Sequence, residues 1–197
     1  MLTGAAGLAG PLLFTLGILV LGLAMPGHDP VRHTISDLGR GPQAVWGDTL
    51  FHLNAGGMVA LAIGAAHAHP GGRGWSAGIL CLALIAPVLV MLGLWDEFDT
   101  DAGPGNWSVH TWLSILLFPL FLIGPLAMIS GAARGGPVPP RLFAASAVLW
   151  PLLALAYFLG PDAVRGLLER AAGMATLLWT LPLGWLLLSR GLAAARR

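Results

Sequence analysis

The sequence has little charge and almost no cysteine. Charged residues make up 10% of its 197 residues, whereas about a quarter of a soluble domain is charged. Lysine is absent and nine acids balance the ten arginines, so the basic surface that a nucleic-acid-binding protein needs is missing. The single cysteine, Cys81, excludes an internal disulfide framework and a cysteine zinc cluster. With a hydrophobic content of 56%, these shortages indicate an integral membrane protein.

Six apolar stretches are long enough to cross a bilayer. A membrane helix needs about 20 mostly apolar residues, because every backbone amide must bond within the helix across about 30 Å of hydrocarbon. None of the six stretches contains Asp, Glu or Arg. We therefore predict an all-α fold in which residues 1–197 form a single domain, one bundle of six transmembrane helices. The spans are placed at about 4–25, 49–68, 76–95, 109–130, 142–160 and 172–189.

The charged residues divide unequally between the two sides of this bundle. An even number of spans puts both termini on one side, together with six arginines and no acid: Arg73, Arg134, Arg141, Arg190, Arg196 and Arg197. The other side carries four arginines and all nine acids. The positive-inside rule then favours cytoplasmic N- and C-termini and an outward acidic face. A lysine-free, Arg- and Ala-rich chain suggests a bacterial source, so the predicted location is the bacterial inner membrane.

The second span carries a ridge of small residues. Gly56, Ala60, Gly64 and Ala68 recur at every fourth position, which predicts close packing of this helix in the bundle and also supports a homo-oligomer through such faces. The same spacing, extended backwards, reaches His52 and Asp48. These two side chains should therefore point inward.

Polar residues gather in the three outward loops. We predict a structural polar cluster there, in which Arg170 either pairs with an acid, the favoured interpretation, or grips a phosphate. A short helix after Pro30 would place His33 and Asp37 on one face, and one beginning near Pro161 would pair Arg165 with Glu169. The cluster comprises His33, Ser36, Asp37, Asp48, Asp99, Glu169 and Arg170.

Two histidines lie about one turn inside the outward ends of their spans. His52 and His110, with Asp99 or Asp101, would supply nitrogen and oxygen ligands for a divalent metal with an open position for water. The catalytic candidates are then His52, His110 and Asp101. The alternative is that each histidine bonds a loop carbonyl, and no HExxH or CxxC pattern supports the metal.

Three segments carry a family resemblance. They are His33-Thr-Ile-Ser-Asp-Leu-Gly39, the stretch from Gly93 to Asp101 followed by His110, and Gly166-Leu-Leu-Glu-Arg170. Together they resemble the bacterial and archaeal family called domain of unknown function 998. The Ile-Ser-Asp-Leu-Gly element of the first, followed by Asn54 in the second span and a histidine at the start of the fourth, is also distantly similar to the eukaryotic DRAM-like six-span family. The resemblance implies a six-helix membrane protein and no known cofactor. Asp96-Glu97 departs from the family's pattern.

Three functions follow from these features. The first is a non-enzymatic module that binds membrane lipids or stabilises the membrane domain, with its outward loops locked by Asp–Arg and His–Asp pairs. The second is a metal-dependent hydrolase acting on a lipid, with Ser36 as a competing nucleophile. The third is a proton-coupled carrier that uses His52, Asp48 and His110 as a relay. Lipid is the expected partner in the first two, and nucleic acid in none.

Overall fold

The computed structural model describes residues 1–39, 44–94, 108–135 and 138–196. Within these ranges the chain is all-α, with six helices long and apolar enough to cross a membrane. This confirms the predicted fold class. The helices are α1 (Leu2–Ala24), α2 (Ala44–His67), α3 (Arg73–Leu94), α4 (Val109–Gly135), α5 (Pro140–Leu159) and α6 (Arg165–Ala195), with the short 3-10 helices η1 (Ser36–Gly39) and η3 (Asp162–Val164).

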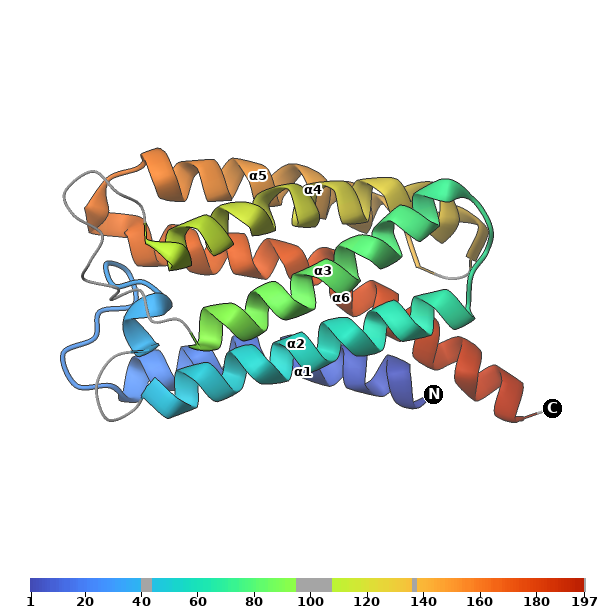
Figure 1. Ribbon diagram of the computed structural model, residues 1–197, viewed down its shortest axis with the longest axis horizontal. Helices are drawn as coiled ribbons and strands as arrows, with labels where there is room; N and C mark the ends of the chain where they lie inside the picture. Colours follow the sequence, from blue (N-terminus) through green and yellow to red (C-terminus); the bar gives the residue numbers. More distant parts are fainter. Residues whose placement is uncertain (40–43, 95–107, 136–137, 197) are drawn as a thin grey trace.

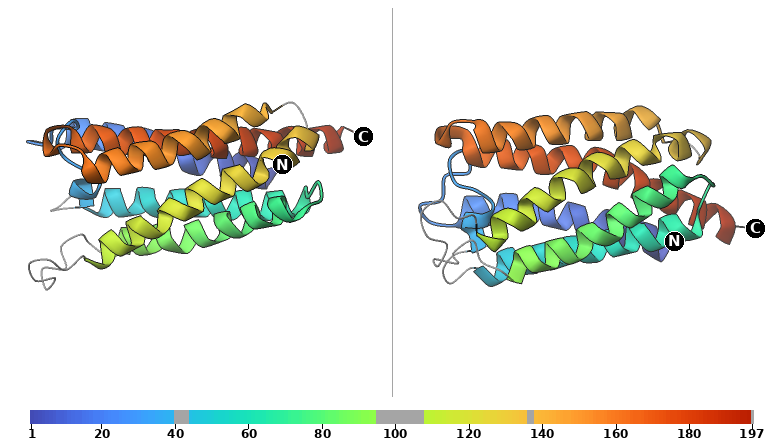
Figure 2. Two further views of the ribbon diagram at one scale, coloured as in Figure 1. Left: turned by 90° about the horizontal axis from the view of Figure 1, so that it is seen from above. Right: turned by 45° about the horizontal axis from the view of Figure 1, so that its top comes forward.

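The six helices close into a ring. Each helix packs mainly on its neighbours in the sequence, and α6 packs back against α1 (Figures 1 and 2). Both ends of the chain lie at one end of the bundle, while η1 and η3 lie at the other (Figure 1). The even number of spans predicted this arrangement. The cytoplasmic orientation of the termini stays a prediction.

Glycines set the spacing of α1 and α2. A Cβ on Gly10 would lie 2.7 Å from the Cα of Gly57, so only glycine allows these two backbones to approach so closely. The predicted ridge is therefore correct at Gly64, where a Cβ would meet Leu187, and wrong at Gly56, which has nothing within 4 Å. The helix turns its Gly57 face inward, because Gly10 of α1 supplies the matching small residue.

Large aromatic and aliphatic side chains fill the end of the bundle that holds the termini. Trp75, Trp179 and Phe143 are fully buried, and the Trp75 indole donates to the Ala65 carbonyl at 2.9 Å. Many large apolar side chains, including Leu16, instead lie on the outer surface. Such a surface is unfavourable in water and suits contact with lipid chains.

Arginines close the loops at this same end. Arg134 donates to the Gly71 carbonyl and Arg190 to the Ala68 carbonyl, both at 3.0 Å. Both acceptors lie in the loop between α2 and α3, so the two arginines fix this loop to α4 and α6. At the opposite end, α6 begins seven residues before the predicted span, so Glu169 and Arg170 lie within its first two turns.

Candidate functional site

The loop after α1 folds around two local hydrogen-bonded turns. Asp29 Oδ1 accepts from the Val31 amide at 2.9 Å, an Asx turn that Pro30 favours. Next, the Asp37 carboxylate accepts from the Thr34 amide at 2.7 Å, while the Asp37 amide donates to Thr34 Oγ1 at 3.1 Å. This reciprocal pair is a capping box, and it starts η1. Asp37 is therefore occupied by a local structural role.

Apolar side chains anchor η1 beneath this cap. Ile35 and Leu38 are buried and pack with Ile18 of α1. Buried residues on either side of Ser36 fix the backbone at Ser36, so its hydroxyl has a defined direction. The short helix begins at Ser36, so His33 lies before it and does not share a helix face with Asp37, and the His33 Nδ1 accepts from the Asp29 amide at 2.9 Å.

Arg170 holds this loop against α6. Its Nη1 donates to the carbonyls of Pro30 at 2.9 Å, His33 at 2.7 Å and Gly166 at 3.0 Å, and its Nη2 meets His28 Nε2 at 2.9 Å. The side chain is only 8% exposed. The partners that bind the guanidinium directly are carbonyls and an imidazole, while Glu169 and Asp37 act on it through their charges. A direct pair of Arg170 with an acid stays a prediction. We call this set of contacts the arginine latch.

Two neighbours complete the latch. A Cβ on Gly166 would overlap the His33 carbonyl, so only glycine lets the loop lie this close to α6. Burial, followed by the charges of Arg170 and His33, lowers the pKa of His28 below its ordinary value of 6.5, against the opposite influence of nearby carboxylates. A neutral His28 leaves Nε2 able to accept from Arg170.

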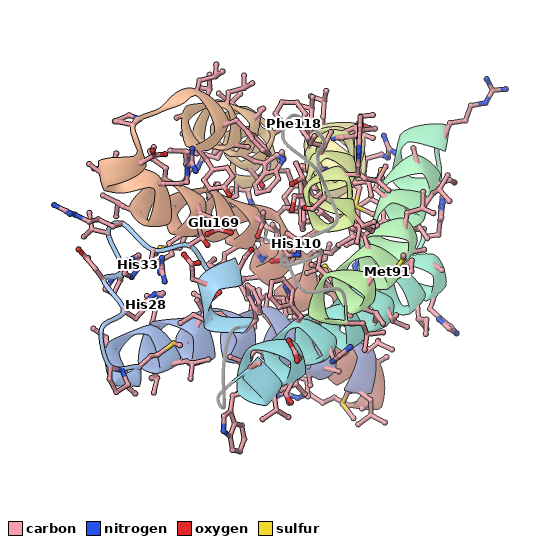
Figure 3. The ribbon with its side chains drawn as sticks, turned by 60° about the vertical axis from the view of Figure 1, so that its left-hand side comes forward. His28, His33, Met91, His110, Phe118 and Glu169 are labelled. Carbon is pink, nitrogen blue, oxygen red and sulfur yellow. The ribbon has the colours of Figure 1, made fainter. Side chains whose placement is uncertain are left out.

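Glu169 and His110 tie the other side of the loop. Glu169 Oε2 accepts from the Ile35 amide at 2.5 Å, and the Ser36 hydroxyl lies 2.8 Å from His110 Nε2. Arg165, the predicted partner of Glu169, instead pairs with exposed Asp162 at 2.7 Å. Figure 3, in which this end of the bundle is turned toward the viewer, shows His110 and Glu169 inside the ring of helices. The loop thus brings Ser36 to residues from two distant helices.

A cavity of about 140 Å³ lies below Ser36, inside the ring of helices. Its polar lining includes Ser36, His110 and Glu169, which come from the end of the bundle opposite the two termini, called the outer end here. Asn54 also lines it, is 7% exposed, and has an Oδ1 without a hydrogen-bond partner among the described residues. Most of the remaining wall is apolar, with aromatic side chains from four helices: Phe14, Phe51, Phe118, Phe121, Trp150, Tyr157 and Phe158.

Two smaller cavities adjoin this one. One of about 10 Å³ is lined by Ser36, His110 and Asp48 among others. Another, of about 30 Å³, lies between α1 and α6 and shares Gly173 with the large cavity. Its outer residues Leu19 and Met174 are exposed on the membrane-facing surface. The large cavity and this groove therefore share part of one wall, and the groove lies beside the membrane-facing surface.

The predicted metal site gains no support. Over residues 1–39, 44–94, 108–135 and 138–196, no three His, Cys, Asp or Glu side chains are placed to hold a metal ion. His52 lines none of these three cavities, and its ring lies near Gly93 of α3. Asp99 and Asp101 lie outside the described residues. The roles of these two acids stay predictions.

Sequence reasoning placed Ser36, Glu169 and Arg170 in one polar cluster and named His110 as a metal or catalytic candidate. Asn54 entered only through the DRAM-like resemblance and was not predicted as a site residue. An isolated amide within an apolar span is costly to bury and usually faces a cavity or a polar partner. That signal alone could have identified Asn54. The close approach at Gly166 has no comparable signal, because the carbonyl it faces lies more than 130 positions away.

Comparison with known proteins confirms the resemblance to the DUF998 family. No curated protein and no solved structure is similar enough to match the chain. A family model matches residues 8–186, a range that includes the loop, the latch and the whole lining of the cavity. The chain belongs to the family described as Protein of unknown function (DUF998), and it is a six-helix membrane-type member of it.

Proposed function

We propose that this protein binds one membrane lipid, with part of an acyl chain in the 140 Å³ cavity and the polar linkage of the lipid beside Ser36 and His110. The observation that carries the proposal is the lining of this cavity, which is mostly aromatic and aliphatic, with Ser36, His110 and Glu169 together at one end and scattered polar side chains such as Asn54 and Thr176 elsewhere. An amphiphile has the same distribution of polarity along its length. Ligand pockets in proteins are usually lined by apolar side chains, with a small number of polar groups that fix the orientation of the ligand.

The size of the cavity supports a partly inserted ligand. A dry apolar cavity of about 150 Å³ holds a molecule the size of benzene, so 140 Å³ takes a segment of a lipid chain and no complete lipid. The remainder of the lipid must lie outside. The groove between α1 and α6 is the proposed path, since it shares wall residues, Gly173 among them, with the cavity and lies beside exposed Leu19 and Met174.

Asn54 narrows the chemistry of the ligand. Its buried Oδ1, without a partner among the described residues, costs free energy unless a donor reaches it. A lipid with a hydroxyl or amide N–H that reaches this part of the cavity would supply that donor. The ligand class is then an acyl lipid with at least one free hydrogen-bond donor.

A pair of glycine variants tests the proposal. Gly173 and Gly56 are both helical glycines whose added Cβ would meet no atom within 4 Å. Gly173 lines the cavity, and Gly56 lies on the exposed side of α2. Gly173→Leu should therefore fill the site, while Gly56→Leu adds the same side chain outside it.

The measurement is the amount of lipid that remains bound to protein purified in mild detergent, counted per chain by native mass spectrometry. Wild type and Gly56→Leu should retain about one lipid, and Gly173→Leu should lose most of it. Equal lipid in all three proteins, or none in wild type, would refute the proposal. A diazirine placed on the acyl chain should in addition crosslink to the α5 segment that carries Tyr157 and Phe158.

A further inference from the structure

The geometry points to Ser36 as a nucleophile, with His110 as its general base, in cleavage of an acyl ester of the bound lipid. This inference rests on the lipid-binding function proposed above and goes beyond it by naming a reaction. The substrate class is a lipid ester that presents its carbonyl at the outer, polar end of the cavity.

The first support is the partner of the Ser36 hydroxyl. Hydroxyls within membrane helices commonly bond a carbonyl one turn earlier, as Ser114, Thr176 and Thr180 do here. Ser36 differs, because its Oγ lies 2.8 Å from His110 Nε2 on a helix 74 positions away. This is the distance required between a nucleophile and its base. With its proton on Nδ1, His110 accepts the Ser36 proton at Nε2.

The second support is the position of this pair between two cavities. Ser36 and His110 both line the 140 Å³ cavity, which holds the acyl chain, and both line the 10 Å³ cavity beside Asp48. The smaller cavity is just large enough for a single water molecule. Hydrolysis needs both an acyl group and a water molecule beside the Ser36 hydroxyl. The large cavity would supply the position for the acyl group and the small cavity the position for the water.

The third support is rigidity. The capping box of Thr34 and Asp37 fixes the turn that carries Ser36, and Glu169 binds the amide of the preceding residue at 2.5 Å. His110 is 8% exposed. Preorganised groups of this kind lower the cost of reaching the reactive geometry. Asp37 and Glu169 are thus positioning residues for the nucleophile.

The reaction balances in two steps. In the first, Ser36 Oγ forms a bond to the acyl carbon while its proton moves to His110 Nε2. The ester C–O bond then breaks, and His110 returns the proton to the departing alcohol, which leaves an acyl ester on Ser36. In the second, water gives a proton to His110 and its oxygen attacks the acyl carbon, and the Ser36 ester bond breaks to release a fatty acid. The proton then returns from His110 to Ser36, which restores the pair.

A fluorophosphonate with a long alkyl chain is the direct probe, because it forms a stable bond only with an activated serine. Purified protein in detergent should gain one adduct mass, and peptide mapping should place it on Ser36. Ser36→Ala should take no label, and His110→Gln should react at least about 100-fold more slowly, the range expected for loss of a general base. Ser189→Ala is the matched control: its hydroxyl also makes one hydrogen bond, to the Leu186 carbonyl, at the opposite end of the bundle, and it should label like wild type.

The outcomes separate this inference from the proposed function. If wild type remains unlabelled while Gly173→Leu still loses its lipid, the pair is a structural tie and lipid binding stands. If wild type remains unlabelled and Gly173→Leu keeps as much lipid as Gly56→Leu, both proposals fail. Because His110→Gln removes a tie to the loop, its thermal stability is measured alongside. Slow labelling of a variant with unchanged stability supports the base, and wild-type labelling of that variant overturns it.

Discussion

Replacement of Arg170 by leucine should destabilise the outer end of the bundle more than removal of any other single arginine contact described above. Leucine occupies part of the same space but donates no hydrogen bond. The carbonyls of Pro30 and His33 then lose their donor in a place that the fold partly shields from water. The Gly166 carbonyl is less affected, because it lies within α6 and has the helix's own donors nearby.

The magnitude follows from the two loop carbonyls. A buried acceptor left without a partner costs about 1–3 kcal/mol, so Arg170→Leu should lower the free energy of unfolding by about 2–6 kcal/mol. Arg170→Lys keeps the charge, but its compact ammonium cannot reproduce the forked geometry of the guanidinium. It should therefore lose about half as much. Arg134→Leu is the control, since Arg134 makes one exposed contact, to the Gly71 carbonyl, and should cost less than about 1 kcal/mol.

The assay is reversible unfolding in mixed micelles, followed by helix content as the fraction of denaturing detergent rises. Hydrogen exchange supplies a local readout: the Ile35 amide, bound to Glu169, and the Leu167 amide, bound to the Val31 carbonyl, should exchange faster in Arg170→Leu. The latch would be refuted if Arg170→Leu unfolded within about 0.5 kcal/mol of wild type, the usual range for a surface change, with unchanged exchange at both amides.

Three further predictions concern the same loop. Burial and the charge of Arg170 hold the pKa of His28 below 6.5, so the free energy of unfolding should decrease as the pH falls below 6.5 and the imidazole takes up a proton. In His28→Leu, the free energy of unfolding should depend less on pH in this range. Asp37→Ala removes the carboxylate of the capping box and should cost about 1 kcal/mol, whereas Asp37→Glu should recover part of the loss in the same unfolding assay. Gly166→Ala forces α6 away from the loop and should lower the melting temperature, while Gly56→Ala, with open space around it, should leave the melting temperature at or above that of wild type.

The helices could be predicted because the signal for a membrane span is local. Each stretch must satisfy its own backbone amides, so length and hydropathy suffice to find it. The division of charge between the two ends could also be predicted, because it depends only on which loop each charged residue lies in. The boundaries were less accurate at α6, which begins at Arg165: the charged residues at its start lowered the local hydropathy without breaking the helix.

The details of the site could be predicted only where they depend on neighbouring residues. The spacing of Thr34 and Asp37 is that of a capping box, yet the same segment of sequence is equally compatible with a helix that places His33 and Asp37 on one face. The small-residue ridge shows the same ambiguity. Gly56 and Gly57 are adjacent in the sequence, and the position of Gly10 on α1 decides which of them packs.

By itself, the sequence determined that this protein is a six-span membrane bundle with an acidic, histidine-bearing end, because both properties depend on composition along short stretches. Tertiary structure alone decided that Arg170 binds loop carbonyls, that Ser36 meets His110, and that a cavity lies beneath them. The physical reason is the distance along the chain: these contacts join residues 74 to 140 positions apart. No local periodicity encodes such a pairing, which exists only after six helices have packed.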